Sequence, residues 1–195
     1  MKIYDISRRI SEETAVWPGD VPFSWRETES VGEKSSSGST CFTMSPHCGT
    51  HADAPSHVLA DGETIGEAPV AAYVGTARVI ELSGRGEVGP DALPPRSLSA
   101  ARVLFRTRGK VSLSPLAAIR LAEKGAMLVG TDAPSIDPPD ADDLPAHRAL
   151  LSRGVALLED LDLEGVPEGE YQLVALPLRF QDLDASPVRA ILIRE

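Results

Sequence analysis

The 195-residue sequence predicts a single α/β domain (residues 1–195), in which a mixed β-sheet is flanked by short helices. Short runs rich in Val, Ile and Leu recur along the chain between Gly, Pro, Ser and Asp residues, as strands do. Helix signals are few, and 16 prolines disfavour long helices because Pro lacks the amide hydrogen that a helix interior uses. The length suits one domain with a hydrophobic core and is short for two.

Eight of these runs are predicted to be strands, although their order in the sheet does not follow from the sequence. Cys41 lies in the run Thr40–Met44 and is expected to be a core residue. The runs are Lys2–Ile6, Thr40–Met44, Ala77–Leu82, Arg102–Arg106, Met127–Val129, Val155–Leu158, Tyr171–Leu176 and Val188–Ile193.

Three segments carry helix signals. Ser114 and Pro115 are typical of an N-cap and a first helical position, and the pattern runs from there to about Lys124. Further helices are expected over Pro145–Ser152 and, shorter, over Ile65–Tyr73, because each segment is followed two residues later by Gly.

The polar stretch Glu27–Ser39 is rich in Ser and Gly and is predicted to be a mobile loop. Two interpretations remain open. The stretch is either a solvated connection or a lid, because it leads directly into the histidine-rich segment described below and loops beside active sites often close over them.

Composition excludes several classes of function. The formal net charge of −10 disfavours binding to nucleic acid or to an anionic membrane surface. No run approaches the roughly 18 apolar residues that span a bilayer, and the charged N-terminus lacks the apolar core of a secretory signal. Two cysteines do not make a disulfide framework. A cytoplasmic protein is therefore expected.

Three of the four histidines, His47, His51 and His57, fall within eleven residues, and Asp53 lies among them. Two neutral imidazoles and one carboxylate are a usual ligand set for zinc and related divalent ions. Three protein ligands leave one position for water, which distinguishes a catalytic site from a closed structural one. The segment therefore predicts a metal-dependent hydrolase.

The local chain favours an extended segment over a helix, because it contains Pro and Gly. Alternate residues of an extended chain share a face, so His51 and Asp53 should point the same way, and Gly49 could let His47 fold back beside them. Cys48 would then face the opposite side and is expected to be a small buried side chain.

Other candidates depend on less local information. From spacing alone, His57 could be a further ligand or a general acid–base. His147 is the remaining histidine, and Glu159 ends an apolar run where a buried strand would emerge. On sequence grounds alone, the acidic ligand from this part of the chain could equally be one of Asp143, Asp160 and Asp162 instead of Glu159. Trp17, in a Trp-Pro-Gly-Asp turn, could equally pack as a plug or stack on a substrate ring.

The segment HCGTHADAPSH resembles the signature of the bacterial kynurenine formamidase (arylformamidase) family, within the cyclase-like metal hydrolases. The resemblance extends over nearly the whole chain. It includes IYDISRRI near the N-terminus, VWPGD at Val16–Asp20, TMSPH at Thr43–His47, YVGTARVIEL at Tyr73–Leu82, GTDAPSIDP at Gly130–Pro138 and YQLVALPLRFQDLDASPVRAIL at Tyr171–Leu192.

The resemblance implies a swivelling β/α/β-type fold and two divalent metal ions per subunit, Zn²⁺ with Mn²⁺ as the alternative. It also selects Glu159 over its acidic neighbours and assigns roles to the other candidates. The first metal would be bound by His47, His51 and Asp53, and the second by Asp53 as a bridge with His147 and Glu159, while His57 would be the proton donor and acceptor and Trp17 would contact the substrate ring.

The implied reaction is hydrolysis of N-formyl-L-kynurenine to L-kynurenine and formate in tryptophan breakdown. The resemblance also implies a small-molecule substrate and a homo-oligomer, specifically a homodimer. The negative net charge disfavours nucleic-acid and membrane partners. No Gly-x-Ser-x-Gly motif is present, which separates the chain from formamidases of the α/β-hydrolase type. Cys48 and Val58 depart from the family pattern, and Val58 bears on the substrate pocket. The alternatives are a related enzyme that acts on another amide or a lactam, as isatin hydrolases do, and a non-catalytic metal-binding protein.

Overall fold

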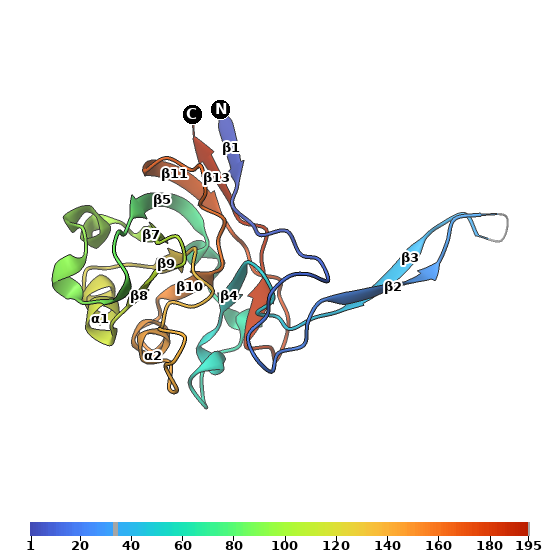
Figure 1. Cartoon of the computed structure of the whole chain (residues 1–195), viewed down its shortest axis with the longest axis horizontal. Coiled ribbons are helices and arrows are strands. Elements are labelled where there is room, and N and C mark those ends of the chain that lie inside the picture. The colour runs from blue at the N-terminus through green and yellow to red at the C-terminus, as the bar shows by residue number, and fades with distance from the viewer. Residues whose placement is uncertain (33–34, 195) are drawn as a thin grey trace.

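The computed structural model describes residues 1–32 and 35–194, and its main feature is a curled, mixed nine-stranded sheet (Figure 1). The central strands β5, β7, β9 and β10 are parallel, and the strands on either side of them are antiparallel. In sheet order, the strands are β1 (Lys2–Asp5), β13 (Ile191–Arg194), β11 (Gly169–Val174), β5 (Val74–Glu81), β7 (Arg102–Arg106), β9 (Leu128–Thr131), β10 (Ala156–Glu159), β4 (His51–Asp53) and β12 (Ala185–Pro187).

Two α-helices, α1 (Pro115–Glu123) and α2 (Pro145–Leu151), pack against each other on the same side of this sheet (Figure 1). The Ser114 side chain accepts a hydrogen bond from the Ala117 amide at 3.2 Å, as predicted for an N-cap. The mixed sheet with short flanking helices confirms the predicted α/β class. No helix in the described ranges is long and apolar enough to cross a membrane.

The sheet separates two hydrophobic cores, because successive side chains of a strand point to opposite faces. On β7, Val103 and Phe105 join the cluster beneath the helices, and Leu104 joins the cluster on the other face. Val58 also lies in the cluster beneath the helices and is 7% exposed. The departure at Val58 therefore affects packing on the helix side of the sheet.

The helix predicted over Ile65–Tyr73 is wrong: the segment forms two separate 3₁₀ turns. Pro69 lies between them and, without an amide hydrogen, cannot continue the hydrogen bonding of a single helix. The five 3₁₀ turns of the described residues are Pro55–His57, Ile65–Glu67, Val70–Ala72, Pro90–Ala92 and Pro95–Ser99, and a small parallel ladder pairs β6 (Gly86–Val88) with β8 (Val111–Leu113).

A two-stranded hairpin, β2 (Ser24–Glu29) and β3 (Ser39–Thr43), projects away from the body of the molecule (Figure 1). The loop prediction for Glu27–Ser39 is therefore wrong at both ends, because Glu27–Glu29 belong to β2 and Ser39 begins β3. The described residues of this stretch extend away from the sheet, and residues 33 and 34 lie outside the described ranges. Cys41 is exposed rather than part of the core. Its apolar run forms a strand, but every residue of β2 and β3 is exposed, so no other layer of the described residues covers the ribbon.

Candidate metal centre

The histidine segment enters the sheet through a turn at Gly49 and continues as β4. Gly49 has φ +71°, a conformation that glycine adopts without steric cost, and a Cβ there would lie 3.1 Å from Ile10 Cγ1. In β4, His51 Nε2 and Asp53 Oδ1 are 3.3 Å apart, which confirms that these two side chains share a face. Cys48 is fully buried, as predicted.

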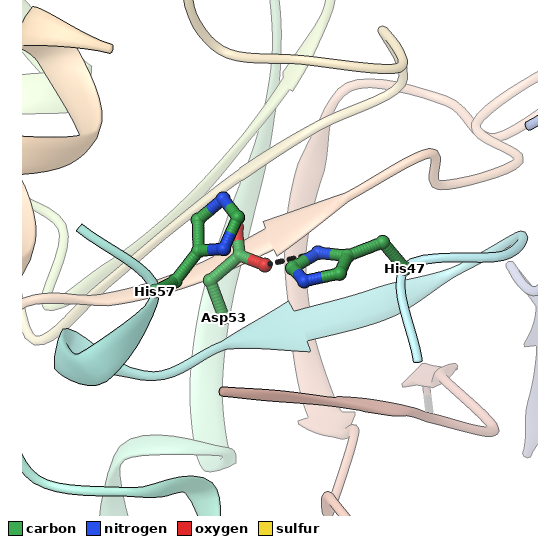
Figure 2. Close-up of side chains that lie close together, drawn as sticks. All are labelled: His47, Asp53 and His57. Atoms are coloured by element: carbon green, nitrogen blue, oxygen red, sulfur yellow. Dashed lines mark ion pairs between the residues drawn. The ribbon is translucent and has the colours of Figure 1, made fainter. Parts of the chain in front are cut away.

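Asp53 is the centre of the cluster and is only 1% exposed. His47 folds back so that its Nδ1 lies 3.1 Å from Asp53 Oδ1, and His57 approaches from the other side (Figure 2). From α2, His147 Nε2 lies 3.5 Å from the second carboxylate oxygen of Asp53. The imidazoles of His47, His51 and His147, from two distant parts of the chain, thus surround one buried carboxylate.

Glu159 completes this arrangement from the neighbouring strand. It is the last residue of β10 and pairs with His51 across the antiparallel β10–β4 ladder. Its Oε1 is 3.1 Å from His147 Nε2, and its Oε2 is 3.6 Å from His51 Nε2. The competing Asp160 instead adopts φ +51° and pairs with Arg8 at 3.3 Å.

Each of the three imidazoles around Asp53 has its other ring nitrogen next to an oxygen acceptor. His51 Nδ1 is 2.8 Å from the Gly49 carbonyl oxygen, and His147 Nδ1 is 2.6 Å from Asp137 Oδ2. His47 Nε2 is 3.1 Å from Asp184 Oδ2. Such partners fix the ring orientation and the tautomer of metal-ligating histidines.

The interatomic distances fit a metal ion. Two ligand atoms about 2.0–2.2 Å from one ion in a tetrahedral arrangement are about 3.3–3.6 Å apart. The nitrogen–oxygen distances around Asp53 and Glu159 lie between 3.1 and 3.6 Å. Both carboxylate oxygens of Asp53 are nevertheless buried without a hydrogen-bond partner among the described residues. Because burying an unpaired charge is costly, these oxygens are suited to bind a cation.

The electrostatics of the cluster favour positive charge. Burial lowers the pKa of His47, but the proximity and charge of Asp53 and Asp184 outweigh it and raise the pKa to about 9. Burial likewise opposes protonation of His51 and His147, yet the neighbouring carboxylates raise both pKa values. Although burial alone would raise it, the pKa of Asp53 is held well below its usual range by the surrounding histidines. A metal ion would displace protons from these rings.

His57 ends the 3₁₀ turn Pro55–His57, and its Nδ1 lies 3.2 Å from Asp184 Oδ2. Its ring centroid is 4.4 Å from that of His47. The side chains with ligand atoms within 4.8 Å of one another form two groups, His47–Asp53–His57 and His51–Asp53–Glu159, among the residues described. These distances permit both roles considered for His57.

Trp17 is 42% exposed and begins the predicted turn, in which the Asp20 amide donates to the Trp17 carbonyl at 3.0 Å. This turn is attached to the histidine segment through Ser45, whose hydroxyl donates to Asp20 Oδ2 at 3.1 Å. The same hydroxyl oxygen accepts a hydrogen bond from the His47 amide at 3.3 Å. Hydrogen bonds thus connect the turn that carries Trp17 to His47.

Two carboxylates beside the cluster, Asp137 and Asp184, were not singled out by the sequence analysis. Asp137 also accepts hydrogen bonds from the backbone amides of Ala146 and His147, at 2.8 and 3.0 Å, so it positions the start of α2 as well as the His147 ring. Both residues lie in segments on which the family resemblance rests, and that was the available signal.

Comparison with known families agrees with this geometry. Residues 4–138, more than half of the chain, match the cyclase family, described as "Putative cyclase". The chain belongs to the cyclase family. His147 and Glu159 lie beyond the matched range, but two relatives match nearly the whole chain. They are kynurenine formamidases from Salinibacter ruber (strain DSM 13855 / M31), 44% identical over 98% of this chain and 97% of the relative, and from Paracidovorax citrulli (strain AAC00-1), 41% identical over 97% and 95%.

Solved structures give the same cyclase-family fold. A structure described as a potential metal-dependent hydrolase with cyclase activity superimposes with a TM-score of 0.85 and 30% identity over 100% of this chain and 98% of that one. Isatin hydrolase A from Labrenzia aggregata has a TM-score of 0.83 over 100% and 94%, but at 23% identity it shows a common fold alone. The resemblance found in the sequence is confirmed.

Proposed function

We propose that this chain is a metal-dependent kynurenine formamidase that hydrolyses N-formyl-L-kynurenine to L-kynurenine and formate. Its relatives with that name are 44% and 41% identical over nearly the full length, which supports the substrate class. The observation that carries the metal-dependent chemistry is Asp53, whose two buried oxygens face three imidazoles and have no hydrogen-bond partner in the part of the chain that the structure describes. A non-catalytic metal-binding protein would not require the additional histidine, His57, beside this cluster.

The proposed ligands form two sets that share Asp53. His47 and His51 would complete the first set, and His147 and Glu159 the second; Zn²⁺ suits these nitrogen and oxygen donors. When bound, such ions lower the pKa of a water molecule toward neutrality and polarise the carbonyl group that the water attacks. The chain's own groups must then orient the substrate and supply the departing nitrogen with a proton.

His57 is the proposed proton carrier. The Nδ1 atom of its ring faces Asp184, so the proton moves through Nε2. Breaking the formamide C–N bond leaves an arylamine nitrogen that needs a proton, and a positioned imidazole can donate it. Water contributes its hydroxyl group to the formyl carbon and its remaining proton to the amine, which gives formic acid and the free amine; the acid then releases its proton to become formate.

A substrate comparison tests the proposed function. We expect the Zn²⁺-loaded protein to hydrolyse N-formyl-L-kynurenine with a kcat/KM at least about 10-fold above that for isatin, because a differently shaped ring misplaces the reacting amide. Absorbance assays with both substrates measure this ratio. Comparable turnover of isatin with none of N-formyl-L-kynurenine would favour the lactam-hydrolase alternative instead.

The same assay tests Trp17, which we propose contacts the aromatic ring of the substrate. Loss of such a contact, about 0.5–1.5 kcal/mol, should raise the KM of a Trp17→Ala variant roughly 2- to 13-fold while kcat changes little. Leu116→Ala, which removes an exposed apolar side chain from α1, serves as the control for loss of an exposed apolar side chain. An unchanged KM in Trp17→Ala would exclude the contact.

We further propose that the protein is a homodimer whose contacts include the β2–β3 hairpin. Trp25 and Phe42 are 55% and 63% exposed there, and an isolated two-stranded ribbon is only marginally stable in water. Sedimentation should give about twice the chain mass of 20.7 kDa, and a Phe42→Glu variant should be monomeric with an unchanged circular dichroism spectrum. Leu116→Glu, on α1, is the control and should stay dimeric. A dimeric Phe42→Glu variant would remove the hairpin from the interface.

A further inference from the structure

Asp184 is held directly beside the histidine segment by the backbone. It immediately precedes β12, whose first residue, Ala185, pairs with Asp53 of β4. The carbonyl oxygen of Asp184 accepts a hydrogen bond from the Ala54 amide at 2.8 Å. These two backbone interactions fix the position of Asp184 beside β4, between His47, which precedes this strand, and His57, which follows it.

One oxygen of this carboxylate contacts two histidines at once. Asp184 Oδ2 lies 3.1 Å from His47 Nε2 and 3.2 Å from His57 Nδ1. An ionised carboxylate only accepts hydrogen bonds, so each ring must carry a hydrogen on the nitrogen that faces it. In a neutral imidazole, the opposite nitrogen is then the one without a hydrogen.

We propose that Asp184 is a positioning residue for catalysis, which fixes the orientation and tautomer of His47 and of His57 through a single carboxylate oxygen. For His47, the nitrogen left without a hydrogen is Nδ1, which lies 3.1 Å from Asp53. For His57, it is Nε2, the atom that carries the proton in the proposed mechanism. Asp184 thereby connects a proposed metal ligand with the proton carrier.

The alternative for Asp184 is a purely structural ion pair. Its side chain is 43% exposed, and exposed pairs generally contribute little to stability. A structural role would therefore leave kcat nearly unchanged on substitution. A positioning role would change kcat, because an amide binds the two N–H groups less strongly than a carboxylate and can also present its own NH₂ group.

Kinetics at saturating Zn²⁺ test the part of this proposal that rests on the proposed function. We expect Asp184→Asn to lower kcat about 10- to 100-fold with little change in KM, and to weaken Zn²⁺ binding in a direct titration. Asp182→Asn, in the same exposed segment, should match the wild type. In a His57→Ala background at saturating Zn²⁺, Asp184→Asn should lower kcat further by no more than about twofold, because His57 is already absent and excess metal offsets the weaker binding through His47. A full repeat of the 10- to 100-fold loss there would show that Asp184 does not act through His57.

A measurement without substrate or metal separates failure of this proposal from failure of the formamidase assignment. In the metal-free wild type, ¹⁵N–¹H correlation spectra of the neutral His57 ring should show the hydrogen on Nδ1. In Asp184→Asn, the two tautomers should mix, whereas Asp182→Asn should retain the wild-type spectrum. Identical His57 tautomers in the wild type and in Asp184→Asn would overturn the proposal, even if the wild type hydrolyses N-formyl-L-kynurenine.

Discussion

Asp53→Asn is expected to abolish hydrolysis of N-formyl-L-kynurenine and to deprive the protein of bound metal. The substitution keeps the shape of the side chain but removes the charge that both proposed ligand sets share. A metal ion contributes several kcal/mol of transition-state stabilisation, so kcat/KM should fall by about 10³-fold or more. The absorbance assay and elemental analysis of the purified variant measure the two losses.

The control for Asp53→Asn is Asp61→Asn, which changes an exposed carboxylate in the same stretch of chain and should behave as the wild type. The losses of metal and activity follow from the electrostatics of the cluster. His47, His51 and His147 all lie beside Asp53, and Asp53→Asn removes the negative charge that these three imidazoles share. Full metal content together with wild-type activity in Asp53→Asn would contradict the proposed ligand sets.

His57→Ala is expected to lower kcat about 10²- to 10⁴-fold while the metal content stays at the wild-type value. This combination distinguishes a proton carrier from a ligand, which the distances alone do not, since His57 lies in one group with His47 and Asp53. Elemental analysis and initial rates on the same samples give both quantities.

His47→Ala is the matched comparison for His57→Ala, since both variants remove an imidazole next to Asp184. We expect His47→Ala to lose metal as well as activity. If His57→Ala loses as much metal as His47→Ala, then His57 is a ligand and the proton must come from another group.

The sequence predicted the local part of the candidate site well because that part depends on a few consecutive residues. Extended chain alone puts His51 and Asp53 on one face, and Gly49 allows the reversal that returns His47. The positions of His147 and Glu159 depend on the order of β9, β10 and β4, which local patterns do not contain. For these two residues, family resemblance supplied what periodicity could not.

The errors in burial and in the missed carboxylates have a common physical origin in long-range context. The apolar run around Cys41 was correctly predicted to be a strand, but burial depends on whether another layer covers that strand. Similarly, Asp184 and Asp137 are ordinary acidic loop residues in the sequence, and only tertiary packing brings each next to a histidine. The mistaken helix at Ile65–Tyr73 is different, because its cause is local: Pro69 interrupts the segment.

The central claim is that this chain hydrolyses N-formyl-L-kynurenine only with metal bound around Asp53. Its most direct test is to remove metal with a chelator, restore Zn²⁺ stepwise and record the hydrolysis rate against metal bound per chain. We predict negligible activity after chelation and a rate that rises with bound Zn²⁺ until the Asp53 sites are filled. Undiminished hydrolysis by thoroughly chelated, metal-free protein would contradict the claim.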